Sequence, residues 1–228
     1  MSDIITGLDL GSSQVKCLVA EKQKNGALSI ISAFKQPSIG FRKGVLIDPE
    51  DAAGMLRELI SEIKQISKSA VKNIFVNLNS QHIKVRISRG IAAVSQPDKE
   101  IKQEDIDRAV QSSRAAKILP NYKVLHTIVR EFFVDDVGDI QIPIGMSGNR
   151  LEVSTLLVEA FAPHFDILVK TLQSVGASVS GIVFNPFAVG RAVLTKRQKE
   201  LGVLLLDLGA GTSSFVVYEE NKPLYAKS

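Results

Sequence analysis

Hydrophobic positions in the first part of the chain fall in short runs separated by turn signals. Residues 4–10, 15–22 and 28–34 are rich in β-branched and aliphatic side chains, and glycine-containing turns at 11–13 and 25–26 divide them. Such runs fit a pleated, half-buried surface. The pattern therefore predicts three consecutive strands that pair in antiparallel fashion.

The pattern then changes to helical spacing. Asp48, Pro49 and Glu50 are typical of a helix N-cap, a first-turn proline and a first-turn acid. Behind them apolar residues recur three and four positions apart, at Leu56, Leu59, Ile60, Ile63 and Ile66. A further strand is predicted at 73–79, so this unit has the layers of an α/β protein.

A different pattern begins at Ile83 and continues to Ala160. It consists of a long strand interrupted by a glycine, an amphipathic helix over 101–113, and strands at 126–134 and 151–161. The order predicts a strand–helix–strand–strand module of the α+β class, small for a domain but large enough to fold.

The first unit resumes after this module. Pro163 opens a helix with a C-cap at Gly176, and a strand follows at 180–185. Asn185, which precedes a proline, predicts the N-cap of a last helix that extends to about Thr195. The module is therefore an insertion within the first unit.

One internal repeat links the two ends of the chain. DLGSSQVKCLVAE at 9–21 and DLGAGTSSFVVYE at 207–219 share Asp-Leu-Gly, a following strand and a glutamate at the same offset. Two similar strand–loop–strand units predict a duplicated fold. The predicted organisation is a first lobe (1–82 with 161–200), an inserted module (83–160) and the first hairpin of a second lobe (201–228).

Both repeated loops have the chemistry of phosphate binding. Glycine after a buried strand lets backbone amides approach an anion closely, and successive amides form an anion-binding concavity. Asp9 and Asp207, at the strand ends, can hold a phosphate-bound Mg²⁺ through water. Lys16 can reach the phosphates as a point charge. The predicted loop residues are Gly11, Ser12 and Ser13 in the first loop and Gly209, Ala210, Gly211 and Thr212 in the second.

The residues that come after each loop exclude the commoner phosphate motifs. A P-loop and a dinucleotide-binding loop each open a helix, whereas both loops here lead into strand-forming residues. The second loop begins a GxGxxG pattern but has Ser214 at its third glycine position. Either loop alone could be an ordinary glycine hairpin, but two matching loops favour a shared binding function.

Composition narrows the function classes. The chain of 228 residues is 45% hydrophobic with a net charge of +4, and the small, scattered excess argues against nucleic-acid binding. A single cysteine, Cys17, fits a reducing cytoplasm and a buried position. His82, His126 and His164 lie far apart in the sequence without ligand spacing, so they predict no metal site. Neither a signal peptide nor a membrane-spanning run is expected.

The paired hairpin loops resemble those of the actin-like ATPase superfamily. Residues 9–16 are similar to its first phosphate motif, lysine included, 207–212 to its second, and 185–188 to its connecting helix. Within that group the chain most resembles the FtsA family of bacterial cell-division proteins, through the segments GLDLGSSQVKCLVAE, SRGIAAV, EIKQEDIDRAVQSSRAA, PIGMSGNRLEV and KELGVLLLDLGAGTSSFVVYEE. PIGMSGNRLEV is the most specific, because it separates this family from other actin-like proteins and from the pilus protein PilM.

The resemblance implies a fold and a set of partners. The fold would be an actin-like (ribonuclease-H-like) α/β lobe with an inserted α+β subdomain and a truncated second lobe. The family implies ATP with Mg²⁺, attachment of FtsZ filaments to the inner membrane, self-association, and binding of other division proteins through 83–160. Asn185 matches the position of a water-positioning polar residue, and any ATPase activity would be weak. The expected location is the cytoplasmic face of the membrane at the division site.

One departure from the family bears on the cofactor. Family chains are nearly twice as long, and their adenosine motif, main FtsZ surface and amphipathic membrane helix have no counterpart here. We therefore expect weak or no ATP binding by this chain alone, only indirect membrane contact, and open apolar edges at the 202–220 hairpin. Two other functions stay open: an interaction module with vestigial loops, and a phosphotransferase, although Asn185 stands where such an enzyme needs an acidic base.

Overall fold

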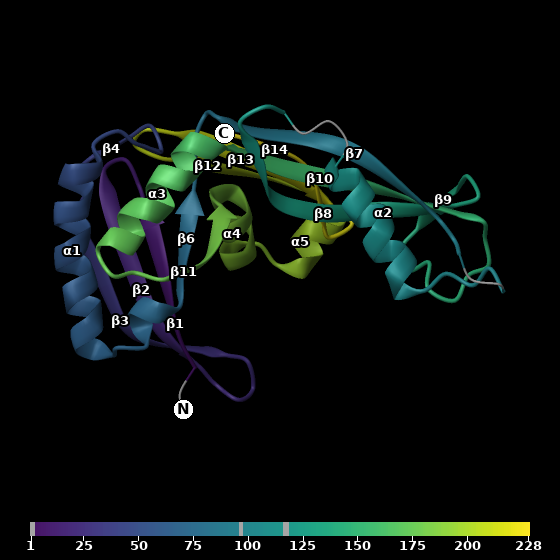
Figure 1. Ribbon diagram of the computed structural model, residues 1–228. Helices are drawn as coiled ribbons and strands as arrows, with labels where there is room; N and C mark the ends of the chain where they lie inside the picture. Colours follow the sequence, from purple (N-terminus) through teal and green to yellow (C-terminus); the bar gives the residue numbers. More distant parts are fainter. Residues whose placement is uncertain (1–2, 96–97, 116–118) are drawn as a thin grey trace.

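A five-stranded mixed sheet forms the centre of the first lobe in the computed structural model, which describes residues 3–95, 98–115 and 119–228 (Figure 1). The strand order is β11-β6-β1-β2-β3. The strands are β1 (Asp3–Leu10), β2 (Gln14–Lys22), β3 (Leu28–Pro37), β6 (Ile74–Leu78) and β11 (Val179–Phe184). The β1–β2 and β2–β3 pairs are antiparallel as predicted, whereas β6 lies parallel to both β1 and β11.

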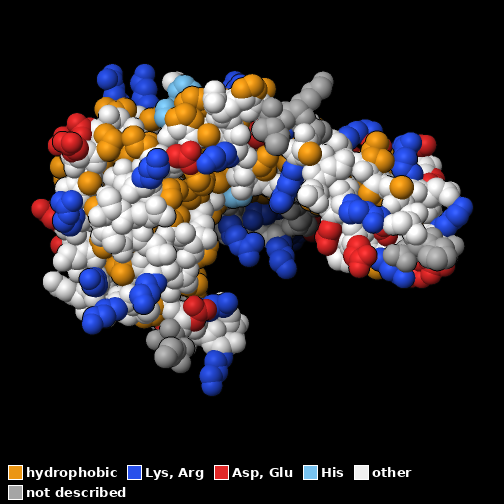
Figure 2. Space-filling model, viewed as in Figure 1, with side chains coloured by type: hydrophobic (Ala, Val, Ile, Leu, Met, Phe, Trp, Pro, Cys, Tyr) orange, Lys and Arg blue, Asp and Glu red, His pale blue; other side chains and the backbone are white. Residues whose placement is uncertain are grey.

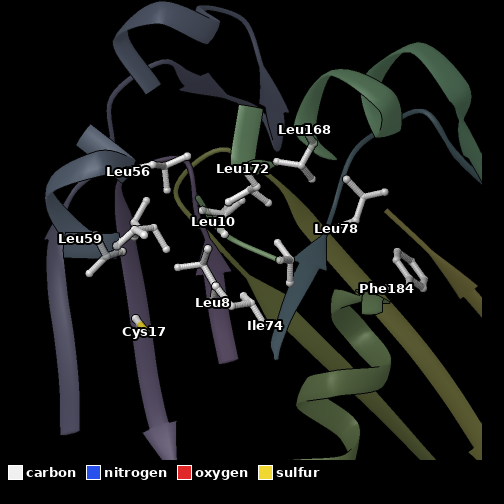
Figure 3. Packing of buried hydrophobic residues seen from close by; sticks show 14 of the residues in the cluster. Leu8, Leu10, Cys17, Leu56, Leu59, Ile74, Leu78, Leu168, Leu172 and Phe184 are labelled. Carbon is white, nitrogen blue, oxygen red and sulfur yellow. The ribbon is translucent and has the colours of Figure 1, made fainter. Parts of the chain in front are cut away.

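Helices cover one face of this sheet and build the main core. Helix α1 (Pro49–Ile66) and helix α3 (Ala162–Ser174) bury their apolar stripes against alternate residues of β1, β2 and β6. Figure 3 shows Leu56 and Leu59 of α1 and Leu172 of α3 directed at strand residues of this core. Asp48 caps α1 as predicted, since its side chain accepts hydrogen bonds from the amides of Glu50 and Asp51.

The inserted module is a four-stranded sheet with one helix on its face. Its elements are β7 (Ile83–Ala93), α2 (Gln103–Ala115), β8 (Tyr122–Val134), β9 (Val137–Ile140) and β10 (Arg150–Phe161), and the strand order is β7-β10-β8-β9. The predicted break at Gly90 is wrong, because β7 runs through it. A Cβ at Gly90 would lie 2.0 Å from the Ala109 carbonyl oxygen, so glycine there lets α2 pack onto the strand.

The second glycine loop belongs to a separate three-stranded sheet. Its strands are β12 (Val203–Leu208), β13 (Ser213–Glu219) and β14 (Lys222–Lys227), in that order. The yellow strands in Figure 1 run from the loop end of β1 and β2, past α4 (Asn185–Val193), to behind the inserted sheet. Val216 and Tyr218 join the main core, and the Lys222 Nζ donates to the Arg130 carbonyl oxygen of β8 at 2.5 Å. The hairpin therefore packs against both the first lobe and the inserted module.

Several short elements escaped the sequence pattern. They are the β4–β5 pair (Phe41–Arg42 and Val45–Leu46), the 3₁₀ turn η1 (Ala70–Lys72), β9, α5 (Lys196–Leu201) and β14. The last predicted helix is in fact two helices, because α4 ends at Val193 and Thr195 caps α5 with a capping box. Met1 and Ser2, assigned to the first lobe, lie outside the described residues. No helix in the described ranges is long and apolar enough to span a membrane.

Candidate functional site

The two glycine loops face each other across a polar cleft, which we call the loop cleft. A Cβ at Gly211 would lie 2.4 Å from the Ser12 Oγ, so the loops approach closely only because glycine stands there. The cleft has a volume of about 310 Å³. Every residue predicted for the site lines it, namely Asp9, Gly11, Ser12, Ser13, Lys16, Asn185, Asp207, Gly209, Ala210, Gly211 and Thr212.

The first aspartate has the predicted lysine as its cross-strand neighbour. Asp9 and Lys16 are paired residues of β1 and β2, and the Lys16 Nζ lies 3.5 Å from the Asp9 Oδ2. Both side chains are roughly half exposed, so this ion pair adds little stability. The ammonium group can therefore exchange the carboxylate for an anion in the cleft at small cost.

Two asparagine side chains connect the two aspartates. The Asn77 Nδ2 donates to the Asp9 Oδ1 at 2.5 Å and to the Asn185 Oδ1 at 3.1 Å. The Asn185 Nδ2 in turn donates to the Asp207 Oδ2 at 2.5 Å. The orientation of the Asn77 side-chain amide is fixed, because its Oδ1 accepts a hydrogen bond from the Leu10 amide at 2.7 Å. This asparagine chain joins the first lobe to the second loop without adding charge.

A second set of contacts holds the far side of the cleft. The Asn79 Nδ2 donates to the Thr212 Oγ1 at 3.0 Å, and the Gly44 amide donates to the Ser12 Oγ at 3.1 Å. Gly44 has φ +71°, and a Cβ there would lie 1.6 Å from the Asn79 carbonyl oxygen. The segment around Gly44 thus brings the two loops and the end of β6 together.

Sequence reasoning missed Asn77, Asn79 and Gly44. The stretch NIFVNLN reads as a strand whose alternate positions are polar, which is typical of any half-exposed sheet face. Asn77 instead lies on the end of β6, next to the end of β1, in a parallel pair. Polar residues at the carboxyl ends of neighbouring parallel strands were the available signal.

The structure corrects the interpretation of Asn185 as a helix cap. Phe184 occupies the N-cap of α4 and makes no side-chain cap hydrogen bond, while Asn185 is the first residue of the helix. Its side chain is engaged with Asp207 and Asn77 instead, because those partners lie within reach at the ends of β12 and β6. The catalytic role predicted for Asn185 stays a prediction.

Other cysteine, histidine and basic side chains lie outside the loop cleft. Burial raises the pKa of the Cys17 thiol to about 12, as expected for a core cysteine rather than a nucleophile. The sequence separation of the histidines was misleading, since the rings of His82 and His164 lie 4.9 Å apart at the start of α3.

Positive charge is also less scattered than predicted, because Lys196, Arg197 and Lys199 gather on α5, where Figure 2 shows a cluster of basic side chains.

The loop cleft offers the ligands that Mg²⁺ uses with phosphates. Over residues 3–95, 98–115 and 119–228, no three His, Cys, Asp or Glu side chains come together as a metal site. Asp9 and Asp207 are thus the cleft's two carboxylates, which fits a cation that keeps water and phosphate oxygens as its other ligands.

Comparisons with known proteins agree with this geometry. Residues 80–159 match the family model for the SHS2 domain inserted in FTSA. The chain is 32% identical to the cell division protein FtsA of Borreliella burgdorferi over 98% of its own length and 54% of that protein. It is also 32% identical to cell division protein FtsA of Pseudomonas aeruginosa, over 95% of its own length and 52% of that protein. The chain therefore spans about half the length of these relatives.

A solved structure supports the fold. A chain of the PilM–PilN type IV pilus biogenesis complex superimposes with a TM-score of 0.67 at 16% identity, covering 98% of this chain and 60% of that chain. The predicted fold class, an actin-like α/β lobe carrying an inserted α+β subdomain, is confirmed. The resemblance to the FtsA family is confirmed over nearly the whole of this chain.

Proposed function

We propose, from this relationship to the FtsA family, that the chain is the phosphate-binding part of an actin-like cell-division scaffold. The observation that carries the proposal is the meeting of both repeated loops, with both aspartates, in one cleft. The ligand we propose is ATP with Mg²⁺. Gly11, Ser12 and Ser13 and the loop at 209–212 would hold the phosphates through backbone amides and hydroxyls. Asp9 and Asp207 would hold the metal ion, and Lys16 would contact a phosphate.

The wider role follows from the family. We propose that the whole protein links FtsZ filaments to the inner membrane at the division site, with the inserted module (83–160) binding division partners and contributing to self-association. We also propose the division into a first lobe, this module and the hairpin at 201–228, and the separate five-, four- and three-stranded sheets support it. The protein would act on the cytoplasmic face of the membrane, with Asn185 positioning water for slow ATP hydrolysis.

In this chain, contacts with the phosphates of ATP should contribute more to binding than contacts with its adenine base. In the described part of the chain, aromatic side chains are absent from the lining of the loop cleft, so stacking of an adenine ring has no support there. We therefore expect magnesium tripolyphosphate to compete with Mg·ATP at similar concentrations.

Titration calorimetry tests the proposal. We expect weak Mg·ATP binding to the chain and at least a tenfold weaker interaction in Asp207→Ala, a loss of about 1.4 kcal/mol. Asp166→Ala is the matched control, because its carboxylate pairs with Lys123 on the surface of α3, away from the cleft. Equal affinities for both variants would place the site elsewhere, and affinity near that of a full-length relative would contradict the expected weakness.

A phosphotransferase is the second candidate. It requires an acidic base near α4, and the carboxylates in the described lining are the two assigned to the metal ion. Asn185→Asp supplies such a base position. We would favour this candidate over the scaffold if the unaltered chain transferred phosphate at least as fast as the Asn185→Asp variant.

A further inference from the structure

A histidine of the inserted module contacts the backbone that carries Asn185. His126 lies on β8, and its Nε2 accepts a hydrogen bond from the Phe184 amide at 2.9 Å. Phe184 ends β11 in the first lobe, immediately before Asn185. The two residues thus bring together different sheets at a point one residue from the loop cleft.

The Phe184 amide has a strong need for this acceptor. The Phe184 side chain is fully buried, and Figure 3 shows it at the edge of the main core, beside helix α4 and the strands of the three-stranded sheet. A buried amide without a partner costs about 1 to 3 kcal/mol. The His126 imidazole meets that need only when Nε2 carries no proton. Burial lowers the pKa of His126, which keeps the ring in that neutral form.

Ring packing fixes the same junction. The rings of His126 and Phe187 lie 5.6 Å apart, and those of Phe184 and Phe187 lie 5.4 Å apart. Phe187 stands in the first turn of α4, so the three rings surround the point where β11 becomes α4. The position of that turn is therefore set from the inserted module as well as from the first lobe.

The residues on either side of Asn185 add no capping hydrogen bond. The N-cap Phe184 provides no side-chain hydrogen bond, and Pro186 has no amide hydrogen to donate. Meanwhile the Asn185 side chain must reach the Asp207 Oδ2 at 2.5 Å and accept from Asn77 at 3.1 Å. A rotation of the Val183–Phe184 peptide would shift the backbone of Asn185, one residue later, and disturb both bonds.

We infer that His126 is a positioning residue: it holds the peptide between Val183 and Phe184, and so the backbone from which Asn185 follows, such that the Asn185 amide bridges Asp207 and Asn77. This inference makes the inserted module a structural part of the loop cleft. Its consequence for ligand affinity rests on the proposed binding of Mg·ATP, whereas its consequence for Asn185 does not.

Three variants test the inference. His126→Phe keeps an aromatic ring but removes the acceptor. His126→Gln keeps an acceptor oxygen in place of Nε2. His82→Phe is the control, because His82 packs against Phe161 and His164 at another point of the junction, without lining the cleft.

The first measurement needs no nucleotide. In ¹⁵N–¹H spectra of the chain, we expect His126→Phe to shift the Phe184 amide and the Asn185 side-chain amide. His126→Gln should leave both signals closer to their original positions, and His82→Phe should not move them. Unchanged Asn185 signals in a folded His126→Phe protein would overturn the inference. Should that protein fail to fold, His126→Asn replaces it, because its shorter side chain withdraws the acceptor, and unchanged Asn185 signals there would overturn the inference equally.

The second measurement is Mg·ATP affinity by titration calorimetry. We expect about fivefold to tenfold weaker binding for His126→Phe, the worth of one buried hydrogen bond, and partial recovery in His126→Gln. Unchanged affinity in His126→Phe would overturn the link to the ligand. If the unaltered chain binds no Mg·ATP, the proposal that this chain holds the nucleotide by itself fails, and the spectra still decide the role of His126.

Discussion

The two glycine-loop hairpins have matching sequences and different surroundings. In the first, β1 and β2 lie inside a five-stranded sheet, and Leu8 and Cys17 are 2% and 1% exposed beneath the helices. In the second, β12 is an edge strand of a three-stranded sheet. Its outward leucines, Leu204, Leu206 and Leu208, are 56%, 61% and 77% exposed.

The comparison shows that the binding residues of a loop and the packing that stabilises its hairpin are independent. Both loops contribute an aspartate and close backbone approach to one cleft, which depends on a few local residues. The first loop is stabilised by a core on its own sheet. The second depends on contacts its inner face makes with α4 and the inserted module, and on the asparagine chain that reaches Asp207. Similar motifs thus have unequal support.

The largest expected effect compares leucines of the two hairpins. Leu8→Ala removes a buried side chain and should lower the free energy of unfolding by about 2 to 5 kcal/mol. Leu206→Ala, on the open face, should change it by no more than about 0.5 kcal/mol. Urea unfolding followed by circular dichroism measures both, and equal losses would show that the outer face of β12 is covered in solution.

The next effect concerns the approach of the loops. Gly211→Ala places a methyl group 2.4 Å from the Ser12 Oγ and should push the loops apart. We expect Mg·ATP affinity to fall about tenfold, by calorimetry. Gly7→Ala is the matched control, because its Cβ meets nothing within 4 Å. A Gly211→Ala chain that binds as tightly as Gly7→Ala would mean that the loops do not act together.

A smaller effect concerns self-association of the chain through the three-stranded sheet. Exposed leucines on an edge strand favour pairing with another chain, as the sequence led us to expect for 202–220. Sedimentation velocity should show self-association that rises with concentration, and the double variant Leu206→Lys, Leu208→Lys should abolish it. Lys35→Ala lies on β3, the edge strand of the five-stranded sheet, and should leave the self-association unchanged. A strictly monomeric unaltered chain would contradict this expectation.

The smallest expected effect is a pH dependence of stability where the inserted module meets the first lobe. Burial lowers the pKa values of His126 and His164 from 6.5, so the folded chain binds fewer protons than the unfolded chain below that pH. The free energy of unfolding should therefore fall as the pH drops below 6.5, and the full contribution of the two histidines should be present above that pH. Urea midpoints on either side of pH 6.5 measure the loss. His126→Gln should reduce it, and an unchanged slope would exclude His126 as a source.

Local patterns in the sequence predicted the longer strands, the main helices and the two glycine loops that line the cleft, because each depends on neighbours along the chain. Residues that meet only in the folded chain escaped. Asn77 reaches Asp9 and Asn185 across long separations, and the alternation in NIFVNLN does not distinguish it from an outward strand residue. Only its place at the carboxyl end of a strand pointed to the cleft. The resemblance named Asn185 as a site residue, but its bond to Asp207 escaped, because an asparagine before proline fits a cap while its actual partner comes from β12. Short elements such as β9 and α5 carry too few residues to show a period.

The asparagine chain also has a consequence for how the protein ages. Asparagine side chains deamidate when the nitrogen of the following peptide attacks the amide carbon, which would turn Asn185 into a third carboxylate facing Asp207. The following residue is Pro186, whose nitrogen carries no hydrogen. The turn that starts α4 therefore protects the Asn185 amide from this reaction and keeps the link to Asp207 neutral.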